Sequence, residues 1–305
     1  MSWETALDRQ IHDYLPDLKW AADEPMAKHT SFRIGGPAKR MAFPKTREQL
    51  VVLMGFLQDA GVKPLLIGNG TNLLVADKGL DTVVIDTSAE LSHIELTDEG
   101  EIAADAGVSL AKLALFAWKN GLTGLEFAHG IPGTLGGGVV MNAGAYGGEL
   151  RDVLTEVTFL DEAGEYRTLP AAELSLSYRH SIFEERPGTV IVEAVLTLTP
   201  GDPAAIRAAM EDYMSRRREK QPLEYGSAGS TFKRPVGNYA SALVDQCGLK
   251  GLSVGGAEVS RKHAGFIINR GGATAADVRE LIAEVQRIVR EKTGYTLECE
   301  IKYIE

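Results

Sequence analysis

Apolar residues recur every three to four positions in several stretches of the chain, which predicts amphipathic helices. The clearest stretch is 275–292, whose apolar positions share one helix face: Val278, Leu281, Ile282, Val285, Ile288 and Val289. A second is 46–61, where Thr46 and Gln49 have capping-box spacing and Gly61 follows as a C-cap. Further helices are predicted over residues 3–20, 108–120 and 203–220.

Short apolar runs bounded by turn residues predict strands between these helices. The predicted strands are 62–67, 82–86, 153–161, 165–169, 190–198, 266–272 with its turn, and a closing strand 296–304. Residues 29–38 are expected to be extended and rich in turns. Residues 62–200 are therefore mostly sheet, and Pro200-Gly201-Asp202-Pro203 marks a break before a more helical part. The expected fold class is α+β.

Composition and charge narrow the classes of function. The chain has 305 residues, enough for two or three domains, and its net charge of −10 argues against general binding of nucleic acid. Two cysteines without a CxxC pair fit a reducing cytoplasm. The six histidines lack metal-ligand spacing, so no metal is expected. No signal peptide, membrane segment or membrane partner is expected.

The segment 121–148 is unusually rich in glycine. Ten of its 28 residues are Gly, and ordering so many glycines costs conformational entropy that some interaction must offset. Backbone that approaches an anionic ligand closely would provide that interaction. A set of tight turns in a β-rich domain is the alternative.

Two loops rich in Gly, Asn and Thr suggest a site for a pyrophosphate. They are 68–72 and 131–138, and their N–H groups together with the hydroxyls of Thr71 and Thr134 could surround the phosphates. The alternative is two unrelated hairpin turns. The chain has no GxxxxGK[ST] motif, and GNGTNLL lacks the third glycine of GxGxxG.

An ordered set of motifs resembles the UDP-N-acetylenolpyruvoylglucosamine reductase (UDP-N-acetylmuramate dehydrogenase) family over nearly the whole chain. The motifs are HTSFRIGG (29–36), IGNGTNLLV (67–75), GLEFAHGIPGTLGGGVVMNAGAYGGE (124–149), YRHSIF (178–183), KQP (220–222), GSAGSTFKRP (226–235), GLKG (248–251), VSRKHAGFIIN (259–269) and LECEIK (297–302). The chain resembles the shorter subtype, because residues 200–305 leave no room for the substrate-covering insertion.

The resemblance implies an FAD-binding domain of the vanillyl-alcohol-oxidase (PCMH) type in two subdomains, 1–66 and 67–200, and an α+β substrate-binding domain, 201–305. It implies non-covalent FAD and NADPH as co-substrate. The small-molecule substrate would be UDP-N-acetylglucosamine enolpyruvate, and the product UDP-N-acetylmuramate, a peptidoglycan precursor. A monomer or a weak oligomer is expected.

Three residues match the catalytic positions of that family. Hydride addition at C3 of an enolpyruvyl ether leaves negative charge that must be stabilised, and C2 then needs a proton. Arg179 would hold the substrate carboxylate, Ser230 would donate the proton, and Glu300 would polarise or protonate the carboxylate. Without the resemblance, they are typical of a surface ion pair, a turn serine and a solvated strand face shared by Glu298, Glu300 and Lys302.

The resemblance also assigns binding residues. For FAD they are Arg33, Ile34, Gly68, Asn69, Gly70, Thr71, Asn72, Ile131, Pro132, Gly133, Thr134, Gly136, Gly137, Asn142 and Ala143. For substrate they are Tyr178, Lys220, Lys233, Arg234 and Lys302. His129 stands where a small residue is expected, which raises the question of a covalent flavin link.

Two other classes of function remain as alternatives. One is an oxidase or dehydrogenase with the same flavin fold that acts on a sugar or lactone. The other is a regulator that binds flavin or nucleotide without catalysis, which the presence of all three catalytic residues disfavours. Flavin that NADPH does not bleach would favour the regulator.

Overall fold

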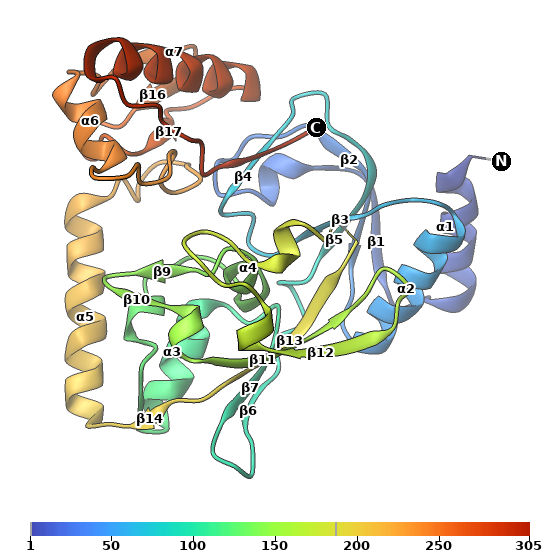
Figure 1. The fold of residues 1–305 in the computed structure, drawn as a ribbon. Coiled ribbons are helices and arrows are strands. Elements are labelled where there is room, and N and C mark those ends of the chain that lie inside the picture. The colour runs from blue at the N-terminus through green and yellow to red at the C-terminus, as the bar shows by residue number, and fades with distance from the viewer. Residues whose placement is uncertain (1, 187) are drawn as a thin grey trace. The chain divides into compact units, whose positions relative to one another are not determined.

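The computed structural model describes residues 2–186 and 188–305 (Figure 1). The chain forms two compact units and passes between them several times. The first unit comprises residues up to Asp23, Lys39–Asn69 and Thr82–Ser215, and the second comprises Glu24–Ala38, Gly70–Asp81 and Arg216–Glu305. The three-domain division inferred from the sequence stays a prediction.

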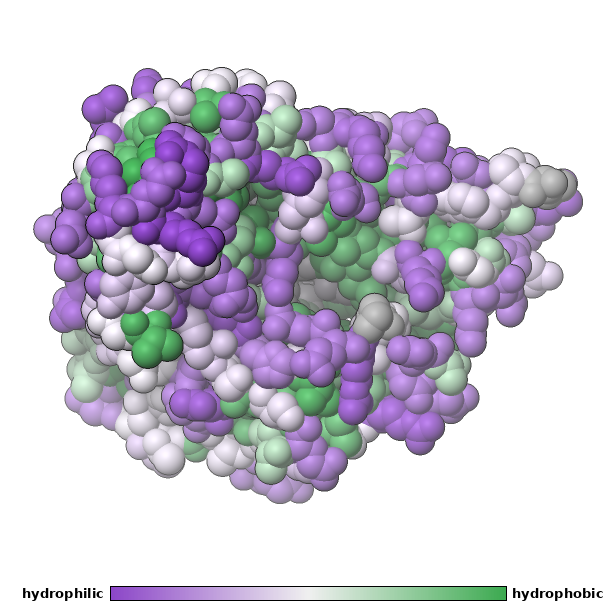
Figure 2. All heavy atoms as spheres, turned by 45° about the horizontal axis from the view of Figure 1, so that its top comes forward, coloured by the Kyte–Doolittle hydropathy of each residue, from purple (hydrophilic) through white to green (hydrophobic). Residues whose placement is uncertain are grey.

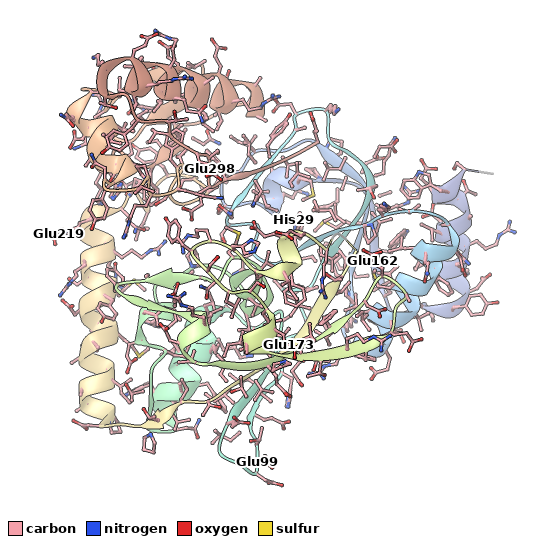
Figure 3. The ribbon with its side chains drawn as sticks, viewed as in Figure 1. His29, Glu99, Glu162, Glu173, Glu219 and Glu298 are labelled. Carbon is pink, nitrogen blue, oxygen red and sulfur yellow. The ribbon has the colours of Figure 1, made fainter. Side chains whose placement is uncertain are left out.

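The larger sheet of the first unit has five antiparallel strands in the order β12-β11-β13-β7-β6. Their bounds are β6 Ile94–Leu96, β7 Ile102–Asp105, β11 Leu154–Leu160, β12 Tyr166–Pro170 and β13 Val190–Leu196. Helices α3 (Leu110–Lys119) and α4 (Leu135–Val140) contribute Leu113 and Leu135 to the core that also holds Val157 and Leu196. Glu99, labelled in Figure 3, lies in the connection between β6 and β7.

A second core of the first unit lies between two helices and a four-stranded sheet. The helices are α1 (Trp3–Tyr14) and α2 (Arg47–Asp59), and the sheet has the order β1-β2-β5-β3. Its strands are β1 Lys19–Pro25, β2 Pro37–Phe43, β3 Leu65–Ile67 and β5 Leu80–Asp86. The core contains Leu7, Ile11, Leu50, Leu53 and Ile85. Strands β3 and β5 are parallel, and the loop that begins at Gly68 follows the carboxyl end of β3.

The second unit packs helices α6 (Ala240–Gln246) and α7 (Ala275–Thr293) around a core with Phe232, Val285 and Ile301. Its sheets are β15-β16-β17 and the parallel pair β18-β4. The strands are β4 Leu73–Val75, β15 Ser253–Val254, β16 Ala257–Val259, β17 Ile267–Asn269 and β18 Lys302–Ile304. Helix α5 (Pro203–Lys220) contains the boundary between the two units.

Short strands and 3-10 turns lie between these elements. The short strands are β8 Leu122–Thr123, β9 Gly144–Ala145, β10 Gly148–Glu149 and β14 Thr199–Pro200. The 3-10 turns are η1 Met26–Lys28, η2 Glu126–Ala128, η3 Leu150–Asp152, η4 Ala171–Glu173 and η5 Ile182–Glu184. Within the described residues, no helix is both long and apolar enough to cross a membrane. Hydrophilic residues cover much of the face drawn in Figure 2.

The predicted helices with sequence caps are confirmed. Thr46 accepts from the Gln49 N–H at the start of α2, and Thr274 and Asp277 form a capping box at the start of α7. Gly294, in the left-handed conformation at φ 77°, ends α7. Helices α3 and α5 and strands β5, β11, β12, β13 and β17 also lie where the pattern predicts them.

Three predicted elements are wrong in extent, and two helices within the described residues escaped prediction. The strand predicted over 62–67 begins only at Leu65, after Pro64, which has no N–H to donate to a sheet. Helix α1 ends at Tyr14 rather than residue 20, because Pro16 disfavours a helical Leu15, whose φ is −131° and ψ 55°. The closing strand covers only Lys302–Ile304, because the chain before it pairs with a different segment. The short helices α4, inside the glycine-rich segment, and α6 were not expected.

Candidate active site

The predicted site residues fall into two groups. The first unit holds Gly68, Asn69, Ile131, Pro132, Gly133, Thr134, Gly136, Gly137, Asn142, Ala143, Tyr178 and Arg179. The second holds Arg33, Ile34, Gly70, Thr71, Asn72, Lys220, Ser230, Lys233, Arg234, Glu300 and Lys302. The loop 68–72 therefore contributes to both units.

In the first unit, the two loops proposed to surround a pyrophosphate lie against each other. The amide of Asn69 donates to the carbonyl oxygen of Pro132 at 2.7 Å. A Cβ on Gly68 would lie only 2.2 Å from Oγ1 of Thr134, so this close approach requires glycine. The start of the 68–72 loop thus lies in direct contact with the first half of the 131–138 loop.

The three consecutive glycines of α4 have different environments. Thr134, which is buried, caps the helix by accepting from the Gly137 N–H. A Cβ on Gly136 would lie 2.9 Å from Cβ of Ala106, and one on Gly138 would lie 2.9 Å from Cδ1 of Leu150. Gly137 is exposed, and its nearest neighbour would be Oγ1 of Thr134 at 3.5 Å. Of these three glycines, only Gly137 therefore has open space around its Cα.

The first N–H groups of α4 are already engaged. The N–H of Leu135 donates to the Val108 carbonyl and that of Gly136 to the Ala106 carbonyl, both at 2.8 Å. These contacts hold α4 against the segment between β7 and α3. A phosphate near this loop would therefore meet donors other than these two, and the assignment of Gly136 to FAD stays a prediction.

Asn142 anchors the turn that carries Arg179. It is fully buried with a positive φ of 40°, and its amide nitrogen donates to the Ser177 carbonyl and to Oε2 of Glu149, each at 3.0 Å. Its Oδ1 accepts from the Arg151 N–H at 3.0 Å. Because these bonds use both ends of the amide, the side chain supports protein structure here. Ala143, next in sequence, donates its N–H to the Gly138 carbonyl.

Tyr178 and Arg179 form a two-residue turn between Ser177 and His180. The N–H groups of Ser177 and His180 donate to each other's carbonyls at 3.2 Å, and Arg179 has a φ of 55°. The guanidinium carbon of Arg179 lies 5.2 Å from the centroid of the Tyr178 ring, whose residue is 48% exposed. A left-handed arginine in a braced turn is a strained conformation of the kind that concentrates at functional sites.

In the second unit, the segments that carry Ser230 and Glu300 pair with each other. The N–H of Glu300 donates to the Thr231 carbonyl at 2.9 Å, and Phe232 bridges Cys299 in antiparallel register. Ser230 is exposed, whereas Glu300 is only 9% exposed. The structure therefore brings two of the three predicted catalytic residues onto neighbouring backbone segments.

The alternative in which Glu298, Glu300 and Lys302 share one solvated strand face is wrong. Glu298, labelled in Figure 3, is exposed and pairs with Nζ of Lys233 at 2.5 Å, whereas Glu300 is buried. Burial also raises the pKa of the intervening Cys299 thiol. The alternation fails because Glu300 and Ile301 are both buried in succession.

The remaining half of the 68–72 loop is tied to the same C-terminal segment. The amide of Asn72 donates to the Glu300 carbonyl at 3.2 Å, and the Lys302 N–H donates to the Asn72 carbonyl at 2.9 Å. Gly70 has a φ of 57°, and a Cβ there would lie 2.1 Å from the carbonyl oxygen of His29, so the position requires glycine. Thr71 is half-buried beside it.

Arg33 and Ile34 lie in a tight turn of the second unit. Arg33 has a φ of 58° and is exposed, and its N–H donates to the Thr30 carbonyl at 3.0 Å. Ile34 is buried in the core of this unit. Lys220 ends α5, and the guanidinium carbon of Arg234 lies 4.6 Å from the centroid of the Tyr239 ring.

Sequence reasoning missed Thr231 as a positioning residue. It is fully buried, its Oγ1 accepts from the Ile267 N–H at 3.0 Å, and its carbonyl receives Glu300. The available signal was the position of Thr231 between the predicted catalytic Ser230 and the core residue Phe232. A threonine that is buried at such a position needs a hydrogen-bond partner for its hydroxyl.

A flavin nucleotide fits the loops of the first unit. Gly137 leaves open space at its Cα beside the Gly68–Thr134 contact. Nδ1 of His129 is buried and, within the described residues, has no hydrogen-bond partner. An orphaned buried nitrogen in the glycine-rich segment is consistent with a group that binds there.

The comparisons with known proteins agree with this arrangement. Residues 38–170 match the family described as FAD binding domain, and the chain is an FAD-containing oxidoreductase. Residues 221–304 match the C-terminal domain of UDP-N-acetylenolpyruvoylglucosamine reductase. Relatives of that name from Caldanaerobacter subterraneus and Syntrophomonas wolfei are each 47% identical to this chain over 97% of its length, and it covers 97% and 98% of theirs. The chain belongs to the UDP-N-acetylenolpyruvoylglucosamine reductase family.

A solved structure supports the same conclusion at the level of the fold. The crystal structure of the UDP-N-acetylenolpyruvylglucosamine reductase from Thermus caldophilus is 34% identical, with a TM-score of 0.80. The match covers 94% of this chain and 99% of that one. The expected α+β fold class is therefore confirmed, with an FAD-binding domain and the C-terminal domain of the reductase family.

Proposed function

We propose that the protein reduces UDP-N-acetylglucosamine enolpyruvate to UDP-N-acetylmuramate at the expense of NADPH, in the synthesis of peptidoglycan precursors. The observation that carries the proposal is the pairing of the Ser230 and Glu300 segments in the second unit. The identity of 47% to reductases of this name over 97% of the chain supports the substrate. When bound, FAD would accept a hydride from NADPH and pass it to C3 of the enolpyruvyl double bond.

The residues of the chain supply charge stabilisation and the proton. Arg179 holds the substrate carboxylate with its planar guanidinium, which matches a carboxylate in two hydrogen bonds. Ser230 donates its hydroxyl proton to C2 as the double bond is reduced, and solvent restores that proton. A serine suffices because the developing carbanion is a strong base. Tyr178, Lys220, Lys233, Arg234 and Lys302 contact the substrate, and the four cations balance its diphosphate and carboxylate.

Glu300 has two possible roles in this scheme, and they predict opposite dependences on pH. As an acid that protonates the carboxylate toward an enol, it must be protonated, and the rate falls as pH rises. As a charged partner that polarises the site, it must be ionised, and the rate falls as pH drops. The pH profile of the step that consumes the enolpyruvyl substrate separates these roles.

The proposal extends to binding and location. The FAD-contacting groups are the backbone of the 68–72 and 131–138 loops and the hydroxyls of Thr71 and Thr134, together with Asn142, Ala143, Arg33 and Ile34. The division into residues 1–66, 67–200 and 201–305 corresponds to two FAD subdomains and a substrate domain. The protein acts in the cytoplasm as a monomer or weak oligomer, and size-exclusion chromatography checks the oligomeric state.

The test is an anaerobic single turnover followed by flavin absorbance. NADPH should bleach the purified protein, and UDP-N-acetylglucosamine enolpyruvate should then restore the absorbance rapidly. In Ser230→Ala, bleaching should be unchanged while recovery slows by roughly 10²- to 10⁴-fold, the usual contribution of a general acid. Ser227→Ala, in the same segment, serves as the matched control and should recover normally.

Three outcomes would overturn the proposal. A purified protein without flavin contradicts the cofactor. Recovery that occurs only after oxygen is admitted favours the oxidase or regulator alternatives. Equal recovery rates in Ser230→Ala and Ser227→Ala remove Ser230 as the proton donor.

A further inference from the structure

Asn72 connects the glycine-rich 68–72 loop to the backbone of Glu300. Its amide nitrogen donates to the Glu300 carbonyl at 3.2 Å, across 228 positions of sequence. Its own carbonyl accepts from the Lys302 N–H at 2.9 Å, and the next residue, Leu73, pairs with Lys302 in parallel register. One residue thus holds the chain on both sides of Ile301.

The Glu300 backbone is also held from its other side. Its N–H donates to the carbonyl of the fully buried Thr231, the neighbour of Ser230. Ile301, which follows, is buried in the core of the second unit. The N–H of Glu300 is therefore fixed by the Ser230 segment, whereas its carbonyl is fixed by the Asn72 side chain. Loss of the amide would release the Glu300 carbonyl and loosen the peptide plane between Glu300 and Ile301, which would allow the Glu300 carboxylate to shift.

We propose that Asn72 is a positioning residue for Glu300, and that its side chain serves this purpose rather than binding FAD. The inference rests on the catalytic role proposed for Glu300. The 68–72 loop then has two tasks. The glycines shape the loop, because Gly68 lies close to Thr134 and Gly70 lies close to His29. The Asn72 amide sets the position of Glu300.

The experiment compares holoenzyme variants in the two half-reactions. Asn72→Ala removes the donor, and Asn72→Asp removes it while keeping nearly the same shape. Gln286→Ala is the matched control, because the Gln286 amide donates to the Leu297 carbonyl at 2.9 Å in the same C-terminal segment but away from Glu300. FAD affinity, the rate of bleaching by NADPH and the rate of recovery with UDP-N-acetylglucosamine enolpyruvate are measured for each.

We expect both Asn72 variants to bind FAD and to bleach at the normal rate. Recovery should slow by roughly 10- to 100-fold, the effect of a small misplacement of a reacting group. The pH dependence of recovery should change in the Asn72 variants and remain normal in Gln286→Ala. Asn72→Ala should add no further loss in a Glu300→Gln background, because both changes act through one group.

Several results would overturn the inference. Weaker FAD binding or slower bleaching in both Asn72 variants would make the side chain a cofactor ligand. Equal slowing in Gln286→Ala, or failure of both Asn72 variants to fold while Gln286→Ala folds, would make it a purely structural anchor. Normal recovery in Asn72→Ala with impaired recovery in Glu300→Gln would overturn the positioning role of Asn72 and leave the proposed role of Glu300 intact. Normal recovery in Glu300→Gln would defeat the proposed role of Glu300 as well.

Discussion

The amide nitrogen of Asn142 lies 3.0 Å from the carbonyl oxygen of Ser177, the residue that opens the turn carrying Arg179. Glu149 and the Arg151 N–H complete the hydrogen bonds of this side chain, which is fully buried. The proposed carboxylate-binding arginine is therefore supported by a residue in the glycine-rich segment. That support rests on a left-handed Asn142, a conformation that asparagine tolerates better than most residues.

Asn142→Ala should destabilise the protein and disturb the Arg179 turn. The variant leaves buried partners unsatisfied and places alanine in a left-handed conformation, with a combined cost of about 2–4 kcal/mol in the free energy of unfolding. Denaturant unfolding measures this cost, and KM for the enolpyruvyl substrate should rise. Asn142→Gly should be less destabilised, because glycine accepts the positive φ. Wild-type stability in Asn142→Ala would contradict the structural role of the buried Asn142 amide.

Arg179→Lys should not preserve function, although it preserves charge. Lysine presents a point charge without the planar fork that binds a carboxylate in two hydrogen bonds. We expect KM for the enolpyruvyl substrate to rise by roughly 10-fold or more, for a loss of about 1.4 kcal/mol or more in binding. Bleaching by NADPH should stay normal. An unchanged KM would show that Arg179 does not hold the substrate carboxylate.

Alanine substitutions at the adjacent residues Gly136 and Gly137 of α4 should affect different properties, stability in the first case and FAD binding in the second. Gly136→Ala would place a Cβ 2.9 Å from that of Ala106 and should lower the free energy of unfolding by about 1–3 kcal/mol. Gly137→Ala meets only Oγ1 of Thr134 at 3.5 Å, so the apoprotein should be at least as stable as wild type. If FAD approaches the backbone at Gly137, this second variant should bind FAD at least roughly 10-fold more weakly, a loss of about 1.4 kcal/mol. Thermal unfolding of the apoprotein and FAD titration separate the two effects. Normal FAD affinity in Gly137→Ala would exclude a close approach there.

Stability should fall at mildly acidic pH because of His263. Burial, reinforced by the charges of Lys250 and Lys220, lowers the pKa of this imidazole, and its Nδ1 accepts from the Gly265 N–H at 3.1 Å. The unfolded chain therefore takes up the proton more readily than the folded one. The stabilisation is present above pH ~6.5 and is lost as pH falls through the lower folded pKa.

His263→Asn keeps an acceptor without a titrating ring, and it should flatten the pH dependence of stability below about pH 6.5. Thermal unfolding across that range provides the measurement. The same slope in wild type and variant would assign the acid sensitivity to other groups.

FAD should leave the protein when it is denatured with acid. His129 has a buried Nδ1 that, among the described residues, makes no hydrogen bond, which fits a non-covalent contact with a bound group. After acid precipitation, the flavin should therefore be found in the supernatant. Flavin that stays in the wild-type pellet but not in the His129→Ala pellet would instead establish a covalent link through this histidine.

Local patterns in the sequence determined the helices with strong amphipathic faces and caps. Helix α7 follows from its apolar stripe, its Thr274–Asp277 box and Gly294, since these signals act within a few residues of one another. The ordered motifs were also sufficient to identify the family. The pattern did not detect α4, because three consecutive glycines weaken any helix signal, and here packing against Ala106 and capping by Thr134 decide the conformation.

Only the tertiary structure decided how the site residues are supported. The sequence does not distinguish the packed Gly136 from the open Gly137, or the buried Glu300 from the exposed Glu298, because these differences arise from neighbours far away in the chain. The hydrogen bond from Asn72 to Glu300 spans 228 positions and has no local signature. Periodicity and capping report short-range preferences, whereas the environment of a side chain depends on which distant segments pack against it.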